Sequence, residues 1–568
     1  MTNRTDVRDD NGAPRAKRGG GRWHPRGRVV EATARDQVRA LLGDRDRAPD
    51  LLIEHLHLIQ DQFGHLSLAH LAALAEEMRL PQAAVYEVAT FYAHFDVVRE
   101  GEIAPPDVTI RVCDSLVCEM KGAEKLISDL ESASGPDVRV VRAPCIGRCA
   151  QAPAAEVGHR AIDHATPETV LAAVGARSFA PLVPDYQDLD AYRAGGGYAL
   201  LQGCHSGDRS HDSLIETMEE SGLRGLGGAG FPAGRKWRLV RNHTGPRLMA
   251  INADEGEPGT FKDRHCLETE PHRFLEGMLI AAWVVEASDI YLYLRDEYPA
   301  ARHILETEIA ALAAAGLTAD HTIHLRRGAG AYICGEESAM LESLEGKRGL
   351  PRHKPPFPAE VGLFGRPTLI HNVETLHWVR EIVEDGAARF ANLGLNGGKG
   401  MRLWSVSGRV MRPGVVAAPA GITARQLIDD HCGGMAEGHV FFAYLPGGAS
   451  GGILTADQAD LPLDFGSLDD FGCFVGSAAI VILSDSDSIR DAVINLTRFF
   501  EGESCGQCTP CRLGTEKAAK LLARPVWDEA LLGDIATAMS DASICGLGHA
   551  AANPMLSAFS RFRSEIGS

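Results

Sequence analysis

The chain has no long hydrophobic run. No apolar stretch in its 568 residues approaches the roughly 18 residues that a membrane-spanning helix needs. The longest stretch, at about 474–483, predicts a buried strand instead. We therefore expect no membrane partner. The basic residues near the start are not followed by a hydrophobic segment, which argues against a secretory signal.

Positive charge is also scarce. The chain has 57 Lys and Arg against 76 Asp and Glu, which gives a net charge of −19. Proteins that bind nucleic acid need a basic face to displace counterions from phosphates, so we expect no nucleic-acid partner. Only residues 1–28 are basic, with eight Arg or Lys and three consecutive glycines. This composition predicts a disordered tail, which is either a solvated extension or an arm that docks a partner subunit.

Cysteine is too sparse for a disulfide framework. Extracellular frameworks are short and dense in cysteine, whereas here 13 cysteines are spread unequally over 568 residues. This usage indicates a reduced, cytoplasmic setting. Five cysteines are isolated in the sequence, and we expect them to be small buried hydrophobic residues. They are Cys204, Cys266, Cys334, Cys432 and Cys473.

The other eight cysteines form two sets of four. The first set has the spacings C-x4-C and C-x3-C with 26 residues between the pairs, and the second has C-x2-C-x2-C with a fourth member 34 residues further on. Such spacings are typical of iron–sulfur clusters, whose irons take thiolates from short turns and distant loops. Structural zinc is the alternative, although it usually uses two C-x2-C knuckles. The predicted ligands are Cys113, Cys118, Cys145 and Cys149, then Cys505, Cys508, Cys511 and Cys545.

Hydrophobic periodicity divides the first third of the chain into two parts. Apolar residues recur at helical spacing and predict a helical module over 29–105. Alternating residues at 108–112 and 138–143 predict strands that lead into the two cysteine pairs of the first set. With an amphipathic segment at 167–174, these strands predict a small α/β domain over 106–176.

Four motifs in this region resemble a known family. EHLHLIQDQFGHLS, VYEVATFYAHF, CDSLVC and CIGRC are similar to segments of the [2Fe-2S] subunit of respiratory complex I and its relatives. All four expected thiolate positions are present. The resemblance covers about 29–176 and implies a thioredoxin-like domain behind a helical bundle, with one [2Fe-2S] cluster.

A glycine-rich segment, RGLGGAGFPAGRKW, occupies residues 224–237. Gly225, Gly227 and Gly230 form the pattern G-x-G-x-x-G, but the preceding LIETMEES predicts a helix where an ordinary dinucleotide-binding fold has a strand. Without Cβ atoms, these residues let backbone N–H groups approach an anion or a flat ring, and Lys236 can supply counter-charge. The alternative is a tight turn at the start of a helix.

Two acidic segments follow. A predicted strand at 247–251 leads to Asn252, Asp254, Glu255 and Glu257 in NADEGEPGTFKDR. Carboxylates and amides at a strand end suit the hydroxyl and ring N–H donors of a nucleotide. RRGAGAYICGEESAMLESLEG is a second segment of this kind, and PRHKPPFPAEVGLFGRPTLIHNVETL follows it. A solvated acidic turn is the alternative.

These segments, in this order, resemble the NADH-binding flavoprotein subunit of complex I. They are also similar to the matching subunits of NAD-linked formate dehydrogenases and NAD-reducing hydrogenases. The resemblance covers about 200–568 and implies FMN and NAD(H) in a Rossmann-like domain over 190–400. By match of motif, FMN would be held by Gly225, Gly227, Gly228, Ala229, Phe231, Lys236, Asn252, Asp254, Tyr332, Gly335, Glu336, Asn372 and Thr375. NAD(H) would be faced by Glu255, Glu257, Glu337, Lys354 and Phe357, of which Glu255 and Glu257 are the catalytic candidates.

One position departs from the complex I pattern. An Asn-Asn pair is usual before V-E-T, and here the pair is His371-Asn372. His371 can still donate to a flavin phosphate, so FMN binding is expected to persist. The departure favours a closer kinship with formate dehydrogenases.

The end of the chain predicts two more modules. Short strands and glycine turns over 401–485 are similar to a β-grasp module. A helical segment over 486–568 contains ESCGQCTPCRLG and presents Cys545 from a later loop between helices. By resemblance, this segment is a [4Fe-4S] domain.

The resemblances together imply electron transfer in a multidomain α/β protein. NADH gives up two electrons together, each cluster accepts one, and FMN converts between the two. A single chain with both units is unlike most complex I, and YLYLRDEYPAARHIL and IHNVETLHWVREIVEDG look closer to the β subunit of formate dehydrogenase. We predict an NAD-linked diaphorase whose partner is a formate-oxidising α subunit with molybdenum- or tungsten-pterin and Fe–S clusters. The alternatives are a hydrogenase diaphorase, a fused complex I module, or an iron–sulfur relay without flavin.

Overall fold

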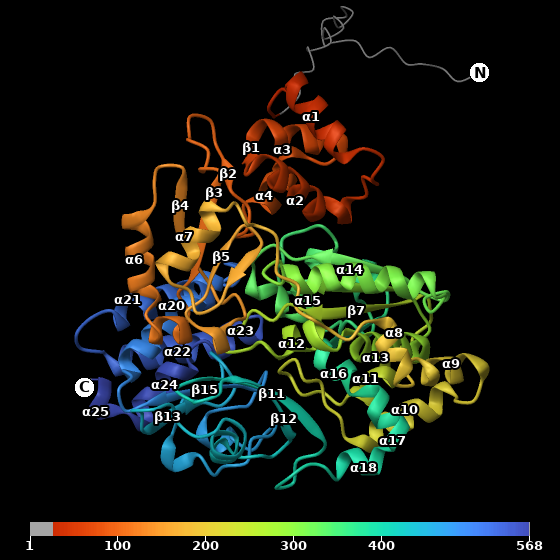
Figure 1. The fold of residues 1–568 in the computed structure, drawn as a ribbon, viewed down its shortest axis with the longest axis vertical. Coiled ribbons are helices and arrows are strands. Elements are labelled where there is room, and N and C mark those ends of the chain that lie inside the picture. The colour runs from red at the N-terminus through yellow and green to blue at the C-terminus, as the bar shows by residue number, and fades with distance from the viewer. Residues whose placement is uncertain (1–26, 567–568) are drawn as a thin grey trace, which may run out of the picture.

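The computed structural model describes residues 27–566 (Figure 1). The predicted basic tail lies outside the described residues except for its last two. Arg28 already belongs to the folded part, because its backbone N–H donates to Gln82 Oε1 at 2.8 Å and its side chain pairs with Glu31 at 2.7 Å.

The first module is a small group of helices, drawn in red in Figure 1. Its elements are α1 (Ala32–Leu42), η1 (Pro49–Leu51), α2 (Leu52–Phe63), α3 (Leu68–Glu77) and α4 (Gln82–Ala89), with a short parallel pair, β1 (Leu66–Ser67) and β2 (Val97–Val98). Gly64 takes a left-handed conformation, with φ of 74°, and ends α2. The helices predicted from the periodicity are therefore present.

The next module is a four-stranded sheet in the order β4-β3-β5-β6. Its strands are β3 (Val108–Cys113), β4 (Val138–Ala143), β5 (Ala155–Val157) and β6 (Arg160–Ile162), and its helices are α5 (Leu116–Met120), α6 (Ala123–Ala133), η2 (Cys149–Gln151) and α7 (Pro167–Gly175). β3 and β4 are parallel, so both lead to the same edge of the sheet, where the first cysteine set lies. Each cysteine pair of that set follows a strand, as predicted.

The largest module has a parallel four-stranded sheet in the order β10-β7-β8-β9. The strands are β7 (Arg247–Ala253), β8 (Ala287–Leu294), β9 (Thr322–Arg327) and β10 (Thr368–Asn372). Around them lie α8 (Leu189–Ala194), α9 (Ala199–Ser206), α10 (His211–Ser221), α11 (Ala233–Arg241), α12 (Lys262–Thr269), α13 (Pro271–Val285), α14 (Pro299–Ala314), η3 (Tyr332–Gly335), α15 (Glu337–Leu344), η4 (Leu363–Gly365), α16 (Val373–His377), α17 (Val379–Asp385) and α18 (Ala387–Ala391).

Both faces of this sheet are buried. Side chains of successive strand residues point to opposite faces, so Met249 and Ile251 join one hydrophobic cluster while Leu248 and Ala250 join another. The first cluster includes residues of α10, α11 and α13, and the second includes residues of α15 and of the helical module. Burial on both faces is typical of parallel sheets, and it leaves the strand ends as the accessible part.

A five-stranded mixed sheet follows in the order β12-β11-β15-β13-β14. Its elements are β11 (Met401–Gly408), β12 (Gly414–Pro419), α19 (Ala424–Gln426), η5 (Leu427–His431), β13 (Phe441–Leu445), β14 (Leu454–Thr455), η6 (Ala456–Gln458), η7 (Asp469–Phe471) and β15 (Ala479–Ser484). The longest apolar run of the sequence ends within β15, whose six residues are all buried. The prediction of a buried strand there is confirmed for its second half.

The chain ends in helices, drawn in blue in Figure 1 beside the orange module that carries the first cysteine set. They are α20 (Ile489–Glu503), α21 (Thr509–Leu522), α22 (Glu529–Ala542), α23 (Gly546–Ala550), α24 (Asn553–Arg561) and α25 (Arg563–Ile566). Asn495 Nδ2 donates to the carbonyl of Asp114 at 2.9 Å and so joins α20 to the first cysteine loop. Within residues 27–566, no helix combines the length and apolar character that crossing a membrane requires.

Candidate functional site

The chain reverses its direction of travel across the parallel sheet between β7 and β10. It runs from β7 through β8 to β9, and then returns to place β10 on the other side of β7. In open parallel sheets, ligands bind outside the carboxyl ends of the strands at such a reversal. Asn372 is the last residue of β10 and Asn252 the next-to-last of β7, and the two are paired in register. We call the residues around these two strand ends the switch-point site.

The glycine-rich loop lies against this site, between α10 and α11. Its backbone closes on itself, because Gly225 N–H donates to the carbonyl of Phe231 at 2.8 Å. Leu226 N–H donates to Thr375 Oγ1 at 2.9 Å, which ties the loop to α16. A Cβ on Gly227 would lie 3.0 Å from that of Asn372, and Gly228 has φ of +117°, so both positions favour glycine. Ala229 and Phe231 are exposed on the rim.

Lys236 projects from α11 with little to neutralise it. Its Nζ donates to the carbonyl of Ile370 at 3.1 Å, and burial lowers its pKa. The ring of Phe231 lies 6.0 Å from the same Nζ. A buried ammonium at a glycine-rich turn suits an anionic group such as a phosphate.

His371 is fixed by a neighbour on α11. Trp237 Nε1 donates to His371 Nε2 at 2.7 Å, so the imidazole carries its proton on Nδ1. Burial, together with the charge of Lys236, holds the pKa of His371 well below its usual range. The side chain is thus a neutral donor through Nδ1, which fits the donation expected of it.

The segment after β7 leaves one carboxyl group without a hydrogen bond. Asn252 Nδ2 donates to the carbonyl of Gly335 at 2.7 Å, and a Cβ on Gly335 would lie 3.1 Å from the carbonyl of Asp254. Within residues 27–566, the carboxyl group of Asp254 accepts no hydrogen bond, and burial raises its pKa well above the usual range. A ligand with hydroxyl or ring N–H donors would satisfy it. The residues present therefore fit a flavin nucleotide.

The second acidic segment forms the next wall. Glu336 caps α15 by accepting from the N–H groups of Ser338 and Ala339, both at 2.9 Å. Lys354 Nζ pairs with Glu337 at 2.6 Å and with Glu336 at 2.9 Å. Phe357 is 55% exposed. This wall offers a carboxylate, a cation and an apolar ring at the surface.

Tyr332 lies beneath this wall. A Cβ on Gly256 would lie 3.1 Å from its ring, and that ring makes a tilted contact with Phe499 of α20 at a centroid distance of 5.0 Å. Its backbone N–H donates to Glu503 Oε2 at 2.9 Å, two residues before Cys505. The segment 332–336 therefore connects the switch-point site with the second cysteine set.

The two catalytic candidates are held by protein groups. Glu255 accepts from the N–H groups of Asp263 at 2.9 Å and Arg264 at 3.1 Å, and from the hydroxyl of Tyr298 at 2.9 Å. Burial and the nearby Asp263 raise its pKa to about 7, although Lys262 opposes this. Glu255 is thus the cap at the start of α12 in this structure. Its predicted contact with NAD(H) stays a prediction.

Glu257 binds a loop of the five-stranded module. Its Oε1 accepts from Ser450 N–H at 2.8 Å, and its Oε2 accepts from Ser477 Oγ at 3.4 Å. Burial raises its pKa, although these hydrogen bonds oppose the rise. The carboxylate therefore joins two modules, and its role toward NAD(H) also stays a prediction.

Sequence reasoning missed a buried charge cluster behind the switch-point site. Lys262 Nζ pairs with Asp263 at 2.8 Å and with Glu374 at 3.1 Å. Burial opposes the charge on Lys262, but the surrounding carboxylates raise its pKa overall. Asn372 accepts from Lys262 at 3.4 Å and donates to Asp263, so the cluster fixes its amide. A lysine directly after the NADEGEPGTF acidic run was the available signal.

All four cysteines of the first set are buried. The Sγ atoms of Cys145 and Cys149 lie 3.5 Å apart, close to the ~3.8 Å expected for two sulfurs on one tetrahedral ion with metal–sulfur bonds of ~2.3 Å. The loop is held from the flavin side, because Arg295 donates to the carbonyl of Cys145 at 2.6 Å and Arg264 to that of Gly147 at 3.0 Å.

The second set lies between the C-terminal helices. Cys505 precedes α21, Cys508 is its N-cap residue and Cys511 lies in its first turn, while Cys545 comes from the loop between α22 and α23, as predicted. Burial raises the pKa of Cys511 to about 12 and that of Cys545 to about 11. Thiolates here need the positive charge of a metal centre.

The sulfur geometry favours clusters over single zinc ions. A four-thiolate zinc site places its sulfurs about 3.8 Å from one another. Within residues 27–566, the only three His, Cys, Asp or Glu residues whose ligand atoms all lie within 4.8 Å of one another are His57, His94 and Asp296. Neither cysteine set is that tight, as expected when several irons and sulfides separate the thiolates.

The five isolated cysteines are all buried, as predicted.

Fold and site together define an NAD(H)-dependent flavin and iron–sulfur oxidoreductase of several modules. Three family models match: a thioredoxin-like [2Fe-2S] ferredoxin over residues 38–177, a Nuo51 FMN-binding domain over 218–381, and an NADH-ubiquinone oxidoreductase-F iron–sulfur binding region over 491–568. FMN, a [2Fe-2S] cluster and a [4Fe-4S] cluster are thus the cofactors of these domains.

Individual relatives specify the family. The second F-type subunit of NADH-quinone oxidoreductase in Rhizobium meliloti is 42% identical over 399 residues, which are 68% of this chain and 94% of that protein. The F-type subunit of the same enzyme in Aquifex aeolicus is 38% identical over 67% of this chain and 91% of its own length. The chain belongs to this family of NADH-quinone oxidoreductase subunits. A chain of an air-oxidised NAD+-reducing [NiFe]-hydrogenase has a TM-score of 0.81 and 32% identity, over 92% of this chain and 94% of that one.

Proposed function

We propose that this protein is the NAD-linked diaphorase β subunit of a formate dehydrogenase. One observation carries the proposal: a single polypeptide joins the [2Fe-2S] and flavin units and has His371-Asn372 where complex I usually has Asn-Asn. The Trp237–His371 hydrogen bond gives that departure a structural role, because it holds His371 as a neutral donor at the end of β10.

FMN would occupy the switch-point site. The glycine loop and Lys236 would take the phosphate, and Asp254 would accept from the ribityl or ring donors. Asn372 and Thr375 would keep the loop in place. When bound, FMN supplies the exchange between a two-electron donor and one-electron acceptors. The chain's own residues bind and orient it and keep water away.

NAD(H) would lie along the wall that carries Glu337, Lys354 and Phe357. A carboxylate such as Glu337 accepts from ribose hydroxyls and repels a 2′-phosphate, so NAD is expected over NADP. Electrons would pass between this site and the clusters by way of the segment 332–336 and the loop after β7. The partner would be an α subunit with molybdenum- or tungsten-pterin that oxidises formate to CO2.

A hydrogenase diaphorase is the second candidate. It is supported by the likeness of nearly the whole chain to a chain of an NAD+-reducing [NiFe]-hydrogenase. A fused complex I module is the third, since the relatives of Rhizobium meliloti and Aquifex aeolicus are quinone oxidoreductase subunits.

The native complex distinguishes these candidates. We expect purification through a tag on this chain to recover a partner with molybdenum or tungsten, and formate to drive NAD+ reduction. Nickel in the complex, together with hydrogen-dependent NAD+ reduction, would show that the protein is a hydrogenase diaphorase. Quinone-linked activity in membranes would show that it is a complex I module. All three candidates bind flavin, unlike an iron–sulfur relay that has lost its flavin site. Bound yellow flavin and NADH-driven dye reduction by the isolated chain would exclude such a relay.

A further inference from the structure

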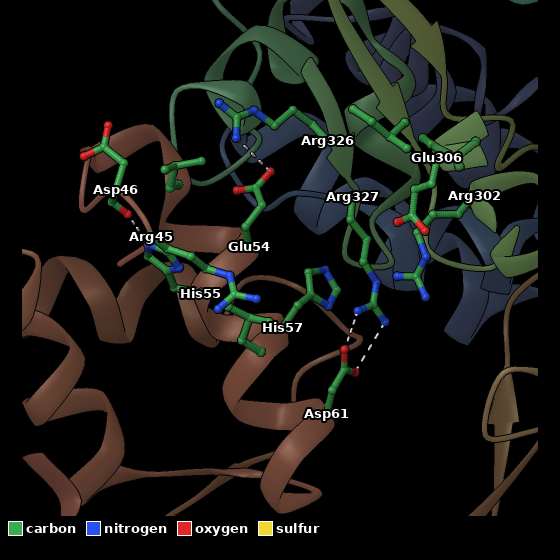
Figure 2. Close-up of a pocket in the computed structure, with 14 residues that line it drawn as sticks. Arg45, Asp46, Glu54, His55, His57, Asp61, Arg302, Glu306, Arg326 and Arg327 are labelled. Carbon is green, nitrogen blue, oxygen red and sulfur yellow. Dashed lines mark hydrogen bonds and ion pairs between the residues drawn. The ribbon is translucent and has the colours of Figure 1, made fainter. Parts of the chain in front are cut away.

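A cavity of about 520 Å3 lies between the helical module and the flavin module. Figure 2 shows α2 on one side of it and the segments that carry Arg302, Arg326 and Arg327 on the other. No residue predicted to bind FMN or NAD(H) lines it. Its walls are charged: Glu54 and Asp61 face the arginines, and His57 sits between them.

His57 presents an imidazole nitrogen with no partner. The side chain is on α2 and is 2% exposed. Its Nε2 lies 2.8 Å from the carbonyl of Gly328, so Nε2 must carry the proton and donate. Nδ1 therefore has a bare lone pair, and this buried atom finds no hydrogen-bond partner among residues 27–566. Leaving such an atom unsatisfied is costly.

His94 repeats this arrangement from the loop after α4. Its Nδ1 lies 2.9 Å from Asp296 Oδ2, and a carboxylate can only accept, so Nδ1 carries the proton. Its Nε2 is buried and has no hydrogen-bond partner in the part of the chain that the structure describes. The rings of His57 and His94 are 4.9 Å apart between centroids.

We propose that His57 and His94 bind one divalent transition-metal ion, with zinc as the best match, at the wall of this cavity. The two histidines and Asp296 lie close together, with one nitrogen or carboxylate oxygen from each residue within 4.8 Å of the others, and Asp296 orients His94. Metal-binding histidines usually donate their other N–H to a carbonyl or a carboxylate, as His57 and His94 do here. Imidazole suits zinc, nickel, copper and cobalt.

The surroundings are compatible with an added cation. The proton of His57 lies on Nε2, which donates to the carbonyl of Gly328, so Nδ1 is the nitrogen available to a metal. Arg327 is balanced by Asp61 at 2.6 Å and also contacts Asp296. Because His57 lines the cavity, the cavity gives both an entry path and room for water on the remaining coordination positions.

The proposed ion would strengthen the contact between two modules. Both histidines belong to the helical module, whereas Gly328 and Asp296, which orient them, belong to the flavin module. His94 N–H also donates to the carbonyl of Ala329 at 3.1 Å. The flavin module therefore fixes the orientation and the protonated nitrogen of both histidines, so metal binding should stabilise the docked state.

Zinc uptake by the intact protein with its clusters and flavin tests the proposal. We expect one zinc per chain after incubation with Zn2+ and gel filtration, and a zinc K-edge spectrum with nitrogen and oxygen ligands at about 2.0–2.1 Å. His57→Ala and His94→Ala should each weaken binding by about tenfold or more. His55→Ala is the matched control, because His55 Nε2 is also 2.8 Å from a carbonyl and its Nδ1 is also unpartnered, but it belongs to no ligand group.

The same experiment can overturn the proposal. No uptake, uptake unchanged in both variants, or equal loss in His55→Ala would each refute it, and so would sulfur ligands at about 2.3 Å, which would mean zinc in the cysteine sets. Cluster and flavin absorption shows whether each variant is folded. If His57→Ala fails to fold, His94→Gln supplies the decisive measurement, because His94 is 14% exposed and tolerates substitution better.

Discussion

The ammonium group of Lys236, whose one hydrogen bond within residues 27–566 goes to the carbonyl of Ile370, marks the anion-binding end of the switch-point site. Replacing Lys236 by Met keeps the length of the side chain and removes its charge. We expect the dissociation constant for FMN to rise about tenfold to a hundredfold, since a hydrogen bond to a charged group contributes about 1.5–3 kcal/mol. Titration of flavin-free protein with FMN, followed by flavin fluorescence, measures this.

The adjacent residue gives the control. Arg235 is exposed, and its guanidinium carbon lies 5.7 Å from the same Phe231 ring. Arg235→Met should leave FMN affinity nearly unchanged. Equal loss in the two variants would mean that general surface charge, rather than the Lys236 ammonium, attracts the phosphate.

A second residue predicts a pH dependence. Burial, reinforced by Asp296, raises the pKa of Glu156 to about 8, although Arg111 on the paired strand opposes this. Between the unfolded pKa of about 4.5 and about 8, the folded protein binds this proton more tightly. Its contribution is therefore fully present below pH 4.5 and is lost as pH rises toward 8, by up to about 1.4 kcal/mol per pH unit.

Glu156→Gln should remove that loss. We expect the variant to unfold at higher urea concentration than the parent at pH 9 and to differ little at pH 5, with unfolding followed by the visible absorbance of the [2Fe-2S] domain. Glu168→Gln is the control, because Glu168 is exposed on α7. A difference between Glu156→Gln and the parent that does not change with pH would refute the assignment.

At the residue scale, the sequence predicts site residues that lie a few positions apart in a recognisable spacing. Both cysteine sets and the glycine loop were found in this way, because short spacings restrict which atoms can meet. The hydrogen bonds of Glu255 could not be found, since they join it to α12 and to Tyr298, which is 43 positions away. The pair of His57 and His94 was missed for the same reason.

At the scale of elements, local patterns predicted strands well. β4 has the bounds expected, 138–143, and β3 extends one residue beyond the expected end to include Cys113. The helix expected before the glycine loop is α10, so the G-x-G-x-x-G pattern is not at the strand-to-helix turn of an ordinary dinucleotide fold. Sheet order could not be predicted, because β10 pairs with β7 across more than a hundred residues. The order β12-β11-β15-β13-β14 supports the β-grasp expectation, which stays a prediction.

The start of α12 yields a prediction that separates two roles of Glu255. As a cap, Glu255→Ala would leave two backbone N–H groups and the Tyr298 hydroxyl unsatisfied, so we expect a loss of about 2 kcal/mol in unfolding free energy. KM for NADH should stay unchanged. Urea unfolding and NADH-driven dye reduction give the two readouts.

The conservative variant sharpens the comparison. Glu255→Gln retains one acceptor oxygen and should lose less stability than Glu255→Ala. If instead KM for NADH rises in both variants while the stability of Glu255→Gln equals that of the parent, Glu255 contacts the nucleotide as the sequence motif suggested.

At the scale of the whole molecule, both cysteine sets converge on the module that holds the switch-point site. Arg295 binds the loop of the first set, and Tyr332 binds Glu503 beside the second. The helix that precedes the second set, α20, also contacts the loop of the first set, through Asn495 and the carbonyl of Asp114. The resemblance in the sequence implied which modules are present, but their mutual contacts arise from long-range packing that no local pattern encodes.

Separate cysteine sets predict separable losses. The intact protein should contain about six irons and one FMN, as one [2Fe-2S] and one [4Fe-4S] cluster. Cys118→Ser should remove the [2Fe-2S] signal from the paramagnetic resonance spectrum of the reduced protein and leave NADH-driven dye reduction largely intact, because Cys118 lies in α5, outside the flavin module. Cys505→Ser should damage the other cluster and lower dye reduction, because Cys505 follows the segment joined to Tyr332. Cys204→Ser, at an isolated buried cysteine, should lose no iron.

Equal loss of dye reduction in Cys118→Ser and Cys505→Ser would mean that electrons leave the flavin through both sets in series. The position of Tyr332 between the switch-point site and Cys505 argues against this.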